Sequence, residues 1–567
     1  MTSEAPRPAQ RDGGERNVAG YAQQAGVDEG NLRARADAKQ VVRVAIAGCS
    51  CAREAERMVR LFLPHARVVC ADEPALGATV DVETVDVETV DVETVDVDIS
   101  LQARVSADGV VAAGFLRVAG VTYQARHHRA MPQTADDITL RRRSKQAVLH
   151  VLHQVLAAWL GRGQPWGILT GIRPLKVLHQ MRRQGWDWTR IRTALADDYL
   201  IAPERIDLMV ETAAAELAAV PDLDQLDREV SVYVGIPFCP THCAYCTFPA
   251  YAMTEKAAYA EAFLSALCKE IDHAGRMLRA YGIPVTSVYV GGGTPTSLRA
   301  HELEMLLSAL CEHIPGFGRW REFTVEAGRP DTISPDRLQV MRRFGVDRVS
   351  VNPQTYRRQT LRAIGRGHTP EMVDHRFLAA RKAGFANINM DIILGLPGET
   401  VADVRHTLAR IAALGPDAVT VHTLSFKRAA PVREAGVRDA VPDDATVRRM
   451  MDEAMAFLRE HGYRPYYLYR QKDILGNLEN VGLALPGKES VYNIAIMEER
   501  QTIIGIGGGA VTKLIGPGGK VCGRFANPRE PRVYVETIDD VIRRKETVLR
   551  PVLAAIAAGR DPDGGLR

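Results

Sequence analysis

The spacing of hydrophobic positions changes along the chain and divides it into regions. Residues 1–40 are polar and show no sustained apolar period, which is typical of a disordered tail. From 41 to about 130 the pattern is one of short strands, as in VSADGVVAAGFLRVAGVTYQA, whose Asp-Gly pair between β-branched runs indicates a hairpin. One helix is expected over residues 51–64. We therefore expect a small α+β region over residues 41–130.

A five-residue repeat interrupts this region. The motif DVETV recurs without a mismatch from Asp81 to Val95. Its valines lie alternately three and two residues apart, a spacing that fits neither a strand nor a helix. The repeat is therefore expected to be an expanded surface loop.

A helical period runs through residues 131–226. Leucine, valine and isoleucine recur at threes and fours through LRRRSKQAVLHVLHQVLAAWL and again through IDLMVETAAAELAAV. The segment PDLDQLDRE that follows indicates a domain boundary. We expect a helical region over 131–226.

Strand and helix patterns alternate from Ser231 to Leu424. The expected strands are SVYVGI, TSVYVGG, EFTVEA, DRVSVNP, NINMDIILG and DAVTVHTL, separated by helical stretches such as VADVRHTLARIAALG. This alternation predicts right-handed βαβ units, a parallel sheet and an α/β fold. Six units predict a partial (β/α)6 barrel over residues 227–430, followed by a mixed α+β extension over 431–567. Functional groups in such folds lie just after the carboxyl ends of the strands.

Composition narrows the class of protein. A chain of 567 residues is too long for one ordinary core, so several domains are expected. Lys+Arg 72 nearly balance Asp+Glu 69, which does not favour binding to nucleic acid or to an acidic membrane. The sequence has neither a long apolar run nor the apolar core of a signal peptide at its start, so we expect a cytoplasmic protein. In that compartment its nine cysteines are expected to be thiols or metal ligands.

Three cysteines stand directly after the first expected barrel strand. Cys239, Cys243 and Cys246 have the spacing C-x3-C-x2-C. Thiolates are soft ligands, and three of them on one loop can hold three corners of an iron–sulfur cube while the fourth iron stays open to a small molecule. Two other interpretations remain: a Cys3His zinc site with His242 or a distant residue as fourth ligand, and unligated core cysteines.

Glycines and polar groups follow the later strands. The second strand ends in GGGTPTSL, whose glycines let a ligand approach the backbone. Glu326, Gln354 and Asp391 lie at the ends of the third, fourth and fifth strands. Each alone is more often a cap or turn residue than a ligand. Because neighbouring parallel strands end at one edge of a sheet, the recurrence indicates one binding site.

These motifs resemble a known superfamily. CPTHCAYC, GGGTP and the later acidic and amide groups resemble the radical S-adenosylmethionine (SAM) enzymes. IPFCPTHCAYCTF, GGGTPTSL, VNPQT, GRGHT and MDIILGLPGET are similar to the oxygen-independent coproporphyrinogen III oxidase (dehydrogenase) family. LTGIRPLKV, TVHTLSFKRAA, YYLYRQKDILGNLENVG and YNIAIMEERQTIIGIGGGAVTK resemble its HemZ-like branch. The resemblance spans roughly residues 165–515.

The resemblance implies two cofactors, a [4Fe–4S] cluster and SAM. Cys239, Cys243 and Cys246 match the cluster ligands, and SAM binds the open iron through its amino and carboxylate groups. Residues that match contacts to SAM are Tyr233, Tyr245, Gly292, Gly293, Thr294, Glu326, Gln354, Arg366, Asp391 and Ser425. An arginine suits a carboxylate, and an Asp or Glu suits paired hydroxyls. A surface charge is the other interpretation of Arg366.

The resemblance also implies an activity. Electron transfer from the reduced cluster splits SAM and yields a 5′-deoxyadenosyl radical, which takes a hydrogen from the β-carbon of a porphyrinogen propionate. Loss of CO2 and one electron leaves a vinyl group, and two rounds convert coproporphyrinogen III into protoporphyrinogen IX in haem biosynthesis. The implied partners are this small-molecule substrate and an unidentified electron donor, without nucleic acid or a membrane span. Candidate cations for the substrate carboxylates, which can equally be solvated charges, are Lys427, Arg428, Arg470 and Lys472.

Departures from the family pattern leave alternatives. Phe248 stands where well-studied oxidases carry an extra cysteine. The Cys-Thr-Phe ending that results is similar to that of the related haem chaperones. The string VYNIAIM, however, lacks the His and Trp of the chaperones' His-Asn-x-x-Tyr-Trp. The first 230 residues do not resemble the oxidases' short N-terminal arm, and a module that docks substrate, partner or electron donor is expected there. The alternatives are a haem-binding chaperone, a radical SAM enzyme on another substrate, and a zinc-bearing scaffold.

Overall fold

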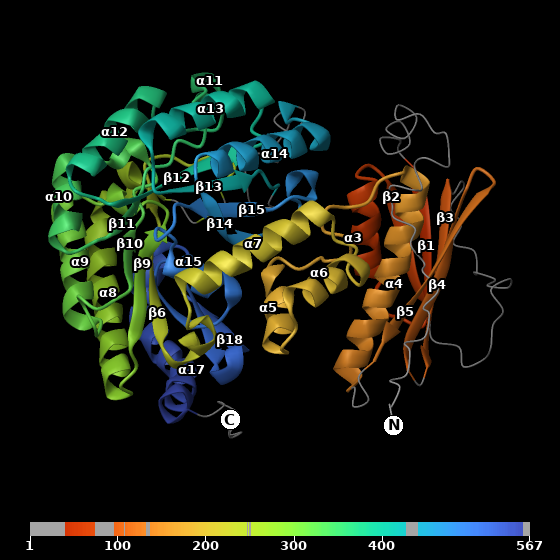
Figure 1. Ribbon diagram of the computed structural model, residues 1–567. Helices are drawn as coiled ribbons and strands as arrows, with labels where there is room; N and C mark the ends of the chain where they lie inside the picture. The colour runs from red at the N-terminus through yellow and green to blue at the C-terminus, as the bar shows by residue number, and fades with distance from the viewer. Residues whose placement is uncertain are drawn as a thin grey trace, which may run out of the picture. The chain divides into compact units, whose positions relative to one another are not determined.

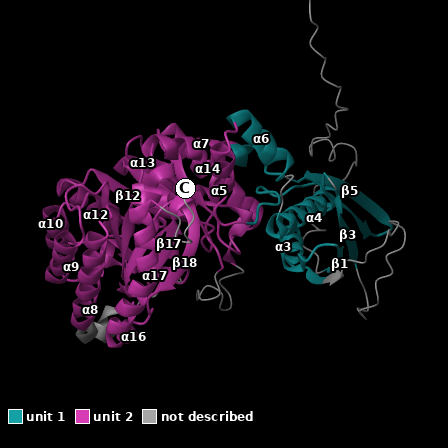
Figure 2. Cartoon of the chain, turned by 90° about the horizontal axis from the view of Figure 1, so that it is seen from below, with its two compact units in different colours: residues 1–170, 187–206 teal, residues 171–186, 207–567 magenta. Residues whose placement is uncertain are grey.

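The protein forms two compact units, residues 1–170 with 187–206 and residues 171–186 with 207–567 (Figure 2). The computed structural model describes residues 40–73, 96–106, 108–131, 136–246, 248, 251–426 and 440–559. The expected tail up to residue 39, the DVETV repeat, Lys427 and Arg428 lie outside the described residues. The helices expected over 131–226 are shared between the two units.

The first unit contains a five-stranded sheet in the order β2-β1-β3-β4-β5 (Figure 1). Its strands are β1 (Val41–Ala47), β2 (Arg67–Glu73), β3 (Val97–Ser106), β4 (Gly109–Val118) and β5 (Val121–Ala130). The predicted Asp-Gly hairpin joins the antiparallel strands β3 and β4, and the predicted helix is α3 (Ala52–Phe62). Helix α4 (Asp137–Leu160) packs on this sheet, where Leu152 shares a core with Ile99 and Phe62.

The second unit contains an eleven-stranded sheet in the order β14-β15-β13-β12-β11-β10-β9-β6-β16-β17-β18. The six predicted barrel strands are β6 (Val230–Ile236), β9 (Val285–Gly292), β10 (Glu322–Val325), β11 (Arg348–Ser350), β12 (Asn387–Leu394) and β13 (Ala418–Thr423). Neighbours among them are parallel and follow chain order. Since β14 and β18 are the edges of this described sheet, the barrel is open. This confirms the partial α/β barrel.

Helices follow the first five of these strands (Figure 1). They are α8 (Met253–Ala280), α9 (Ala300–His313), α10 (Pro335–Arg343), α11 (Arg358–Ala363), α12 (Pro370–Lys382) and α13 (Val401–Leu414), with the short strands β7 (Phe238–Cys239) and β8 (Tyr251–Ala252) between β6 and α8. Helix α13 begins where Thr400 and Asp403 exchange capping hydrogen bonds. It ends at Gly415, whose φ of 64° is a left-handed conformation that glycine adopts without strain.

The C-terminal residues extend both edges of the parallel sheet. Strand β15 (Asn480–Ala484) is antiparallel to β13, and β14 (Arg464–Tyr469) is antiparallel to β15. At the other edge, β16 (Thr502–Gly507) lies parallel to β6, followed by the antiparallel β17 (Val511–Gly516) and β18 (Lys520–Ala526). The remaining helices are α5 (Leu175–Arg183), α6 (Trp188–Asp197), α7 (Pro203–Ala219), α14 (Asp444–Glu460), α15 (Val491–Glu498), α16 (Pro531–Glu536) and α17 (Ile538–Ala558). None of the helices in the described part of the chain has both the length and the apolar character that a membrane crossing requires.

Candidate functional site

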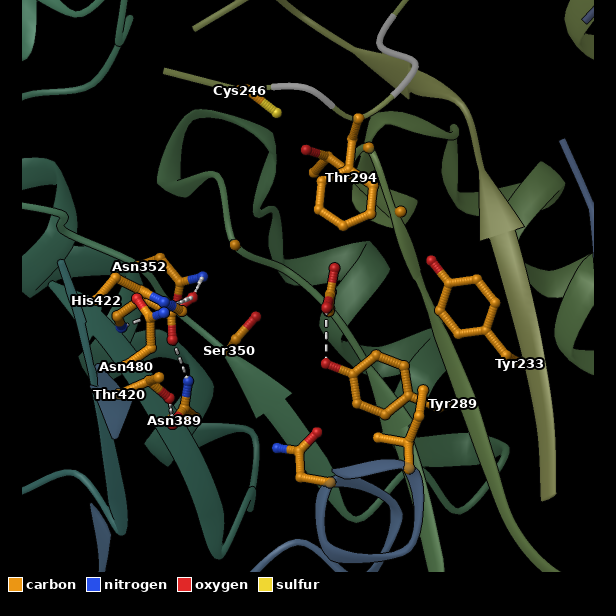
Figure 3. A pocket seen from close by; sticks show the side chains of 18 of the residues that line it. Tyr233, Cys246, Tyr289, Thr294, Ser350, Asn352, Asn389, Thr420, His422 and Asn480 are labelled. Atoms are coloured by element: carbon orange, nitrogen blue, oxygen red, sulfur yellow. Dashed lines mark hydrogen bonds and ion pairs between the residues drawn. The ribbon is translucent and has the colours of Figure 1, made fainter. Parts of the chain in front are cut away.

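A cavity of about 720 Å3 is lined by residues at the carboxyl ends of the parallel strands. Every residue that the sequence predicted for a cluster or for SAM lines this one cavity, and Figure 3 draws part of it. They are Cys239, Cys243, Cys246, Tyr233, Tyr245, Gly292, Gly293, Thr294, Glu326, Gln354, Arg366, Asp391 and Ser425. The expectation that these strand-end groups converge is therefore correct as geometry.

The cysteine loop follows β6. Cys239 ends the short strand β7, and Cys243 and Cys246 lie in the turn after it. The N–H of Cys246 donates to the carbonyl of Cys243 over 3.0 Å, and the N–H of Ala244 donates to the carbonyl of Ile364 over 3.1 Å. The loop is thus anchored on the end of α11. Cys239 and Cys243 are buried and Cys246 is half-buried, and none of the three is in a disulfide.

The three sulfur atoms of Cys239, Cys243 and Cys246 do not all lie within 4.8 Å of one another. Among the described residues, a single group of three His, Cys, Asp or Glu side chains has its ligand atoms within 4.8 Å of one another, and that group is His179, Glu216 and Glu498. A tetrahedral zinc ion with bonds of about 2.3 Å would hold sulfurs about 3.8 Å apart. The wider spacing suits a cluster, in which each sulfur binds a different iron. His242 is exposed and does not line the cavity, so it is not placed as a fourth zinc ligand.

Polar side chains contact the sulfurs of Cys239 and Cys243. Cys239 Sγ lies 3.2 Å from Thr294 Oγ1, and Arg329 Nη1 donates to Cys243 Sγ over 3.2 Å. Arg329 also pairs with Asp331 at 2.9 Å. Burial raises the pKa of Cys239 to about 11, although the Thr294 hydrogen bond and the Arg329 charge lower it. A thiol of this kind loses its proton when a metal binds.

The glycine segment at the end of β9 lies against the cysteine loop. The N–H groups of Gly293 and Thr294 donate to the carbonyls of Ile236 and Phe238, each over 2.7 Å. A Cβ on Gly293 would lie 2.6 Å from the Phe238 carbonyl oxygen, so a larger residue does not fit. Gly292 has a φ of 106°. The N–H groups of Gly293 and Thr294 already donate within the chain, so the groups that this segment has for a ligand are its carbonyl oxygens.

Glu326 lines the cavity together with three tyrosines. Tyr289 Oη donates to Glu326 Oε1 over 2.6 Å (Figure 3). The ring of Tyr289 stacks on Tyr492 with centroids 4.4 Å apart and on Tyr233 with centroids 6.2 Å apart. Burial raises the pKa of Glu326 to about 7, although the bond from Tyr289 lowers it. This carboxyl group therefore changes its charge near neutral pH.

Asp391 is surrounded by hydrogen-bond donors. Asn352 Nδ2 and Asn389 Nδ2 each donate to its carboxylate over 2.7 Å, and His422 Nε2 lies 3.6 Å away (Figure 3). Burial would raise the pKa of Asp391, but the contacts of His422 and Asn389 outweigh burial and lower it. Gln354, with a φ of 64°, donates its N–H to the Asp391 carbonyl over 2.9 Å. Asp391 is therefore a half-buried but ionised carboxylate.

Arg366 and Tyr245 form a contact beside the cysteine loop. Arg366 Nη2 donates to Tyr245 Oη over 2.9 Å, and Arg366 Nη1 donates to the Gly328 carbonyl over 3.0 Å. The guanidinium is thus bonded inside the cavity and is not the surface charge of the alternative interpretation. Ser425 Oγ donates to Gln471 Oε1, and both residues line the cavity.

Two of the four cations expected for the substrate carboxylates, Arg470 and Lys472, are described by the structure and lie away from the cavity. Arg470 is buried and donates to Asn477, Lys472 is exposed, and neither lines the cavity. Side chains alternate along an extended segment, so Tyr469 and Gln471 line the cavity whereas Arg470 between them does not. The cations that do line it are Arg173, Arg329, Arg348, Arg366, Lys513 and Arg524.

Several lining residues carried no signal in the sequence. Tyr289, Arg329 and His422 lie on or just after expected strands. A single tyrosine, arginine or histidine there has no local pattern that separates a functional residue from a packed one. The string VEAGRPD contains Arg329, yet only the fold shows that its side chain contacts Cys243.

Known proteins are similar to this chain. The family model described as the Radical SAM superfamily matches residues 233–411. The chain is 45% identical over 454 residues, 80% of this chain and 90% of the relative, to the oxygen-independent coproporphyrinogen-III oxidase-like protein HemZ of Bacillus subtilis. It is 31% identical over 321 residues, 55% of this chain and 78% of the relative, to the heme chaperone HemW of Lactococcus lactis.

A solved structure is similar as well. The coproporphyrinogen III oxidase HemN of Escherichia coli, a radical SAM enzyme, matches with a TM-score of 0.46 and 24% identity over 59% of this chain and 78% of that chain. The extent and identity of the match to HemZ establish the family. The chain therefore belongs to the radical SAM superfamily, with a [4Fe–4S] cluster and SAM as its cofactors, and within it to the family of the coproporphyrinogen-III oxidase-like protein HemZ.

Proposed function

We propose that the protein converts two propionate side chains of coproporphyrinogen III to vinyl groups without oxygen, giving protoporphyrinogen IX. The observation that carries the proposal is the single cavity lined by all three cysteines and all ten expected SAM contacts. The substrate is supported by the relative at 45% identity, which is named an oxygen-independent coproporphyrinogen-III oxidase-like protein. Each conversion removes one hydrogen atom from the β-carbon, releases CO2 and passes one further electron to an acceptor.

In this proposal Cys239, Cys243 and Cys246 each bind one iron and leave the fourth iron for SAM. The three sulfurs do not all lie within 4.8 Å of one another, which supports one iron for each sulfur over a single shared metal ion. Arg329, which donates to Cys243 Sγ, offsets the negative charge of the thiolates and fixes the orientation of one ligand. When bound, the cluster and SAM supply the carbon-centred radical that can take a hydrogen atom from a substrate.

We propose a partner in the chain for each polar part of SAM. The carbonyls of Gly292 and Gly293 accept from its amino group, with Glu326 next to them, and Arg366 binds its carboxylate. The ionised Asp391 accepts from its ribose hydroxyls. The remaining proposed contacts are Tyr233, Tyr245, Thr294, Gln354 and Ser425.

A second candidate function is haem binding by a chaperone. Phe248, 55% exposed and lining the cavity, stands where the oxidases of the resemblance carry a further cysteine. The relative at 31% identity is named a heme chaperone. A chaperone would bind haem stoichiometrically and form no vinyl product.

The experiment that tests the proposal is anaerobic. The reconstituted protein is given reductant, SAM and coproporphyrinogen III, and the tetrapyrroles are read by mass. Two successive propionate-to-vinyl conversions, absent in Cys243→Ala, are the expected result. Formation of 5′-deoxyadenosine with an unchanged tetrapyrrole would reject this substrate, and stoichiometric haem binding would then favour the chaperone.

A further inference from the structure

Four cations gather on one carboxylate at the cavity. Arg173 Nη1 lies 2.6 Å from Glu499 Oε1, and Arg524 Nη2 lies 3.9 Å from the same oxygen. Lys176 and Lys513 also pair with Glu499. Arg173, Lys513 and Arg524 line the cavity, so we call these three residues the cationic cluster.

The cationic cluster carries more positive charge than its surroundings neutralise. The three cluster cations and Lys176, set against the single carboxylate of Glu499, leave a surplus of three positive charges before other groups are counted. The neighbouring Glu498 adds at most part of a negative charge, because burial raises its pKa to about 7. Burial and the charge of Arg173 lower the pKa of Lys513 to about 8, although its bond to Glu499 raises it. A network with a purely structural role would be expected to balance its charges more closely.

The fold holds these side chains in place. Lys513 of β17 pairs with Ile503 of β16 on one side and with Arg524 of β18 on the other. The Lys513 side chain is 8% exposed, and Arg173 Nε is buried without a hydrogen-bond acceptor among the described residues. The site is therefore built into the sheet.

The cationic cluster contains none of the residues expected to bind SAM. Its three residues lie outside residues 233–411, the part of the chain that matches the superfamily model. The single carboxylate of SAM needs one such cation, and a surplus of positive charge suits a ligand with several carboxylates. The cavity lining also includes Ile172, directly before Arg173 in sequence, and Ile496 and Met497, shortly before Glu499, and these apolar side chains suit an apolar ring.

We propose that the cationic cluster is a carboxylate-binding subsite that anchors the propionates of a tetrapyrrole substrate. This inference rests on the proposed function, of which it specifies the substrate contacts. The subsite replaces Arg470 and Lys472, which do not line the cavity. Arginine forks and a lysine ammonium together match several carboxylates at different angles.

Binding of coproporphyrin III, a stable tetra-acid, and of its neutral tetramethyl ester to the reconstituted protein tests the subsite. Arg173→Gln, Lys513→Met and Arg524→Gln should each weaken binding of the acid about tenfold, because each removes a charged hydrogen-bond partner. Binding of the ester and SAM cleavage without substrate should not change. Arg524 is 62% exposed, so its substitution leaves the core intact.

Arg405→Gln is the matched control, since Arg405 is 62% exposed and pairs with Glu453 away from the cavity lining. Equal weakening by this control, or unchanged binding of the acid in all three cluster variants, would overturn the subsite while the proposed function stands. Loss of SAM cleavage in the cluster variants would assign these cations to the cofactor instead. A wild-type protein that neither binds nor converts the tetrapyrrole would overturn the proposed function and the subsite with it.

Discussion

The two walls of the cavity come from different parts of the chain and differ in charge. The wall of the cysteine loop is built by loops after the parallel strands and carries charges of both signs, such as Arg329, which pairs with Asp331, and Asp391, which accepts from Asn352. The other wall includes Arg173 in the segment before α5, Lys513 of β17 and Arg524 of β18, and it carries the surplus positive charge around Glu499. Partnered groups hold one ligand in one orientation, whereas surplus charge attracts carboxylates. We infer that the chain separates radical chemistry from substrate anchoring.

The largest expected effect is that of Cys243→Ala, which changes only the wall of the cysteine loop, called the first wall below. Loss of one of three cluster ligands should lower reductive SAM cleavage about a hundredfold or more, since even the partners of metal ligands contribute up to that much. Binding of coproporphyrin III should stay unchanged. Iron content measures the cluster, 5′-deoxyadenosine measures SAM cleavage, and porphyrin fluorescence measures binding of coproporphyrin III. The half-buried Cys311 gives the matched control, Cys311→Ala. A cluster of normal iron content in Cys243→Ala would refute the ligand assignment.

A smaller effect, the pH dependence of SAM affinity, should distinguish Glu326 from Asp391, the two carboxyl groups of the first wall. Because the pKa of Glu326 is about 7, wild type and Glu326→Gln are both neutral at this position at pH 6, and only wild type is charged at pH 8. The ratio of their SAM affinities should therefore grow about tenfold from pH 6 to pH 8, as the charge attracts the amino group of SAM.

Asp391→Asn is the contrast for this measurement. Its carboxylate has a lowered pKa and stays ionised throughout that range, so its affinity ratio to wild type should not change with pH. Calorimetric titration of SAM into the reconstituted proteins measures both ratios. A pH-dependent ratio for Asp391→Asn, or a constant one for Glu326→Gln, would show that the two groups are assigned wrongly.

The smallest expected effect is that of salt. Raising the ionic strength from about 0.05 to 0.5 M should weaken binding of coproporphyrin III several-fold, because Arg524 is exposed and its charge is screened. SAM, expected among buried and partnered groups, should respond less, and the tetramethyl ester should not respond. Fluorescence titrations at several salt concentrations provide the comparison. An equal salt response of SAM and coproporphyrin III would remove the distinction between the two walls.

Local patterns predicted one wall almost completely. The apolar runs of the six barrel strands, the helices between them and the residues after each strand end are contiguous in sequence, and parallel strands in chain order bring these ends together. The convergence of Cys239, Glu326 and Asp391 therefore followed from the order of the elements. The contact of Arg329 with Cys243 did not, because a side-chain direction after a strand is set by packing.

The sequence by itself determined the alternation of strands and helices, the cysteine spacing and the set of groups at the strand ends. Only the tertiary structure decided which cations reach the cavity. Arg173 bonds to Glu499, which is more than 300 residues away in the sequence. Lys513 lies on β17, which pairs with β16, and β16 in turn pairs with β6. A strand's pattern specifies that it pairs but not with which partner, since pairing over such separations depends on the whole sheet. Arg470 was expected in the cavity. Because side chains alternate along an extended segment, its neighbours Tyr469 and Gln471 line the cavity and Arg470 does not.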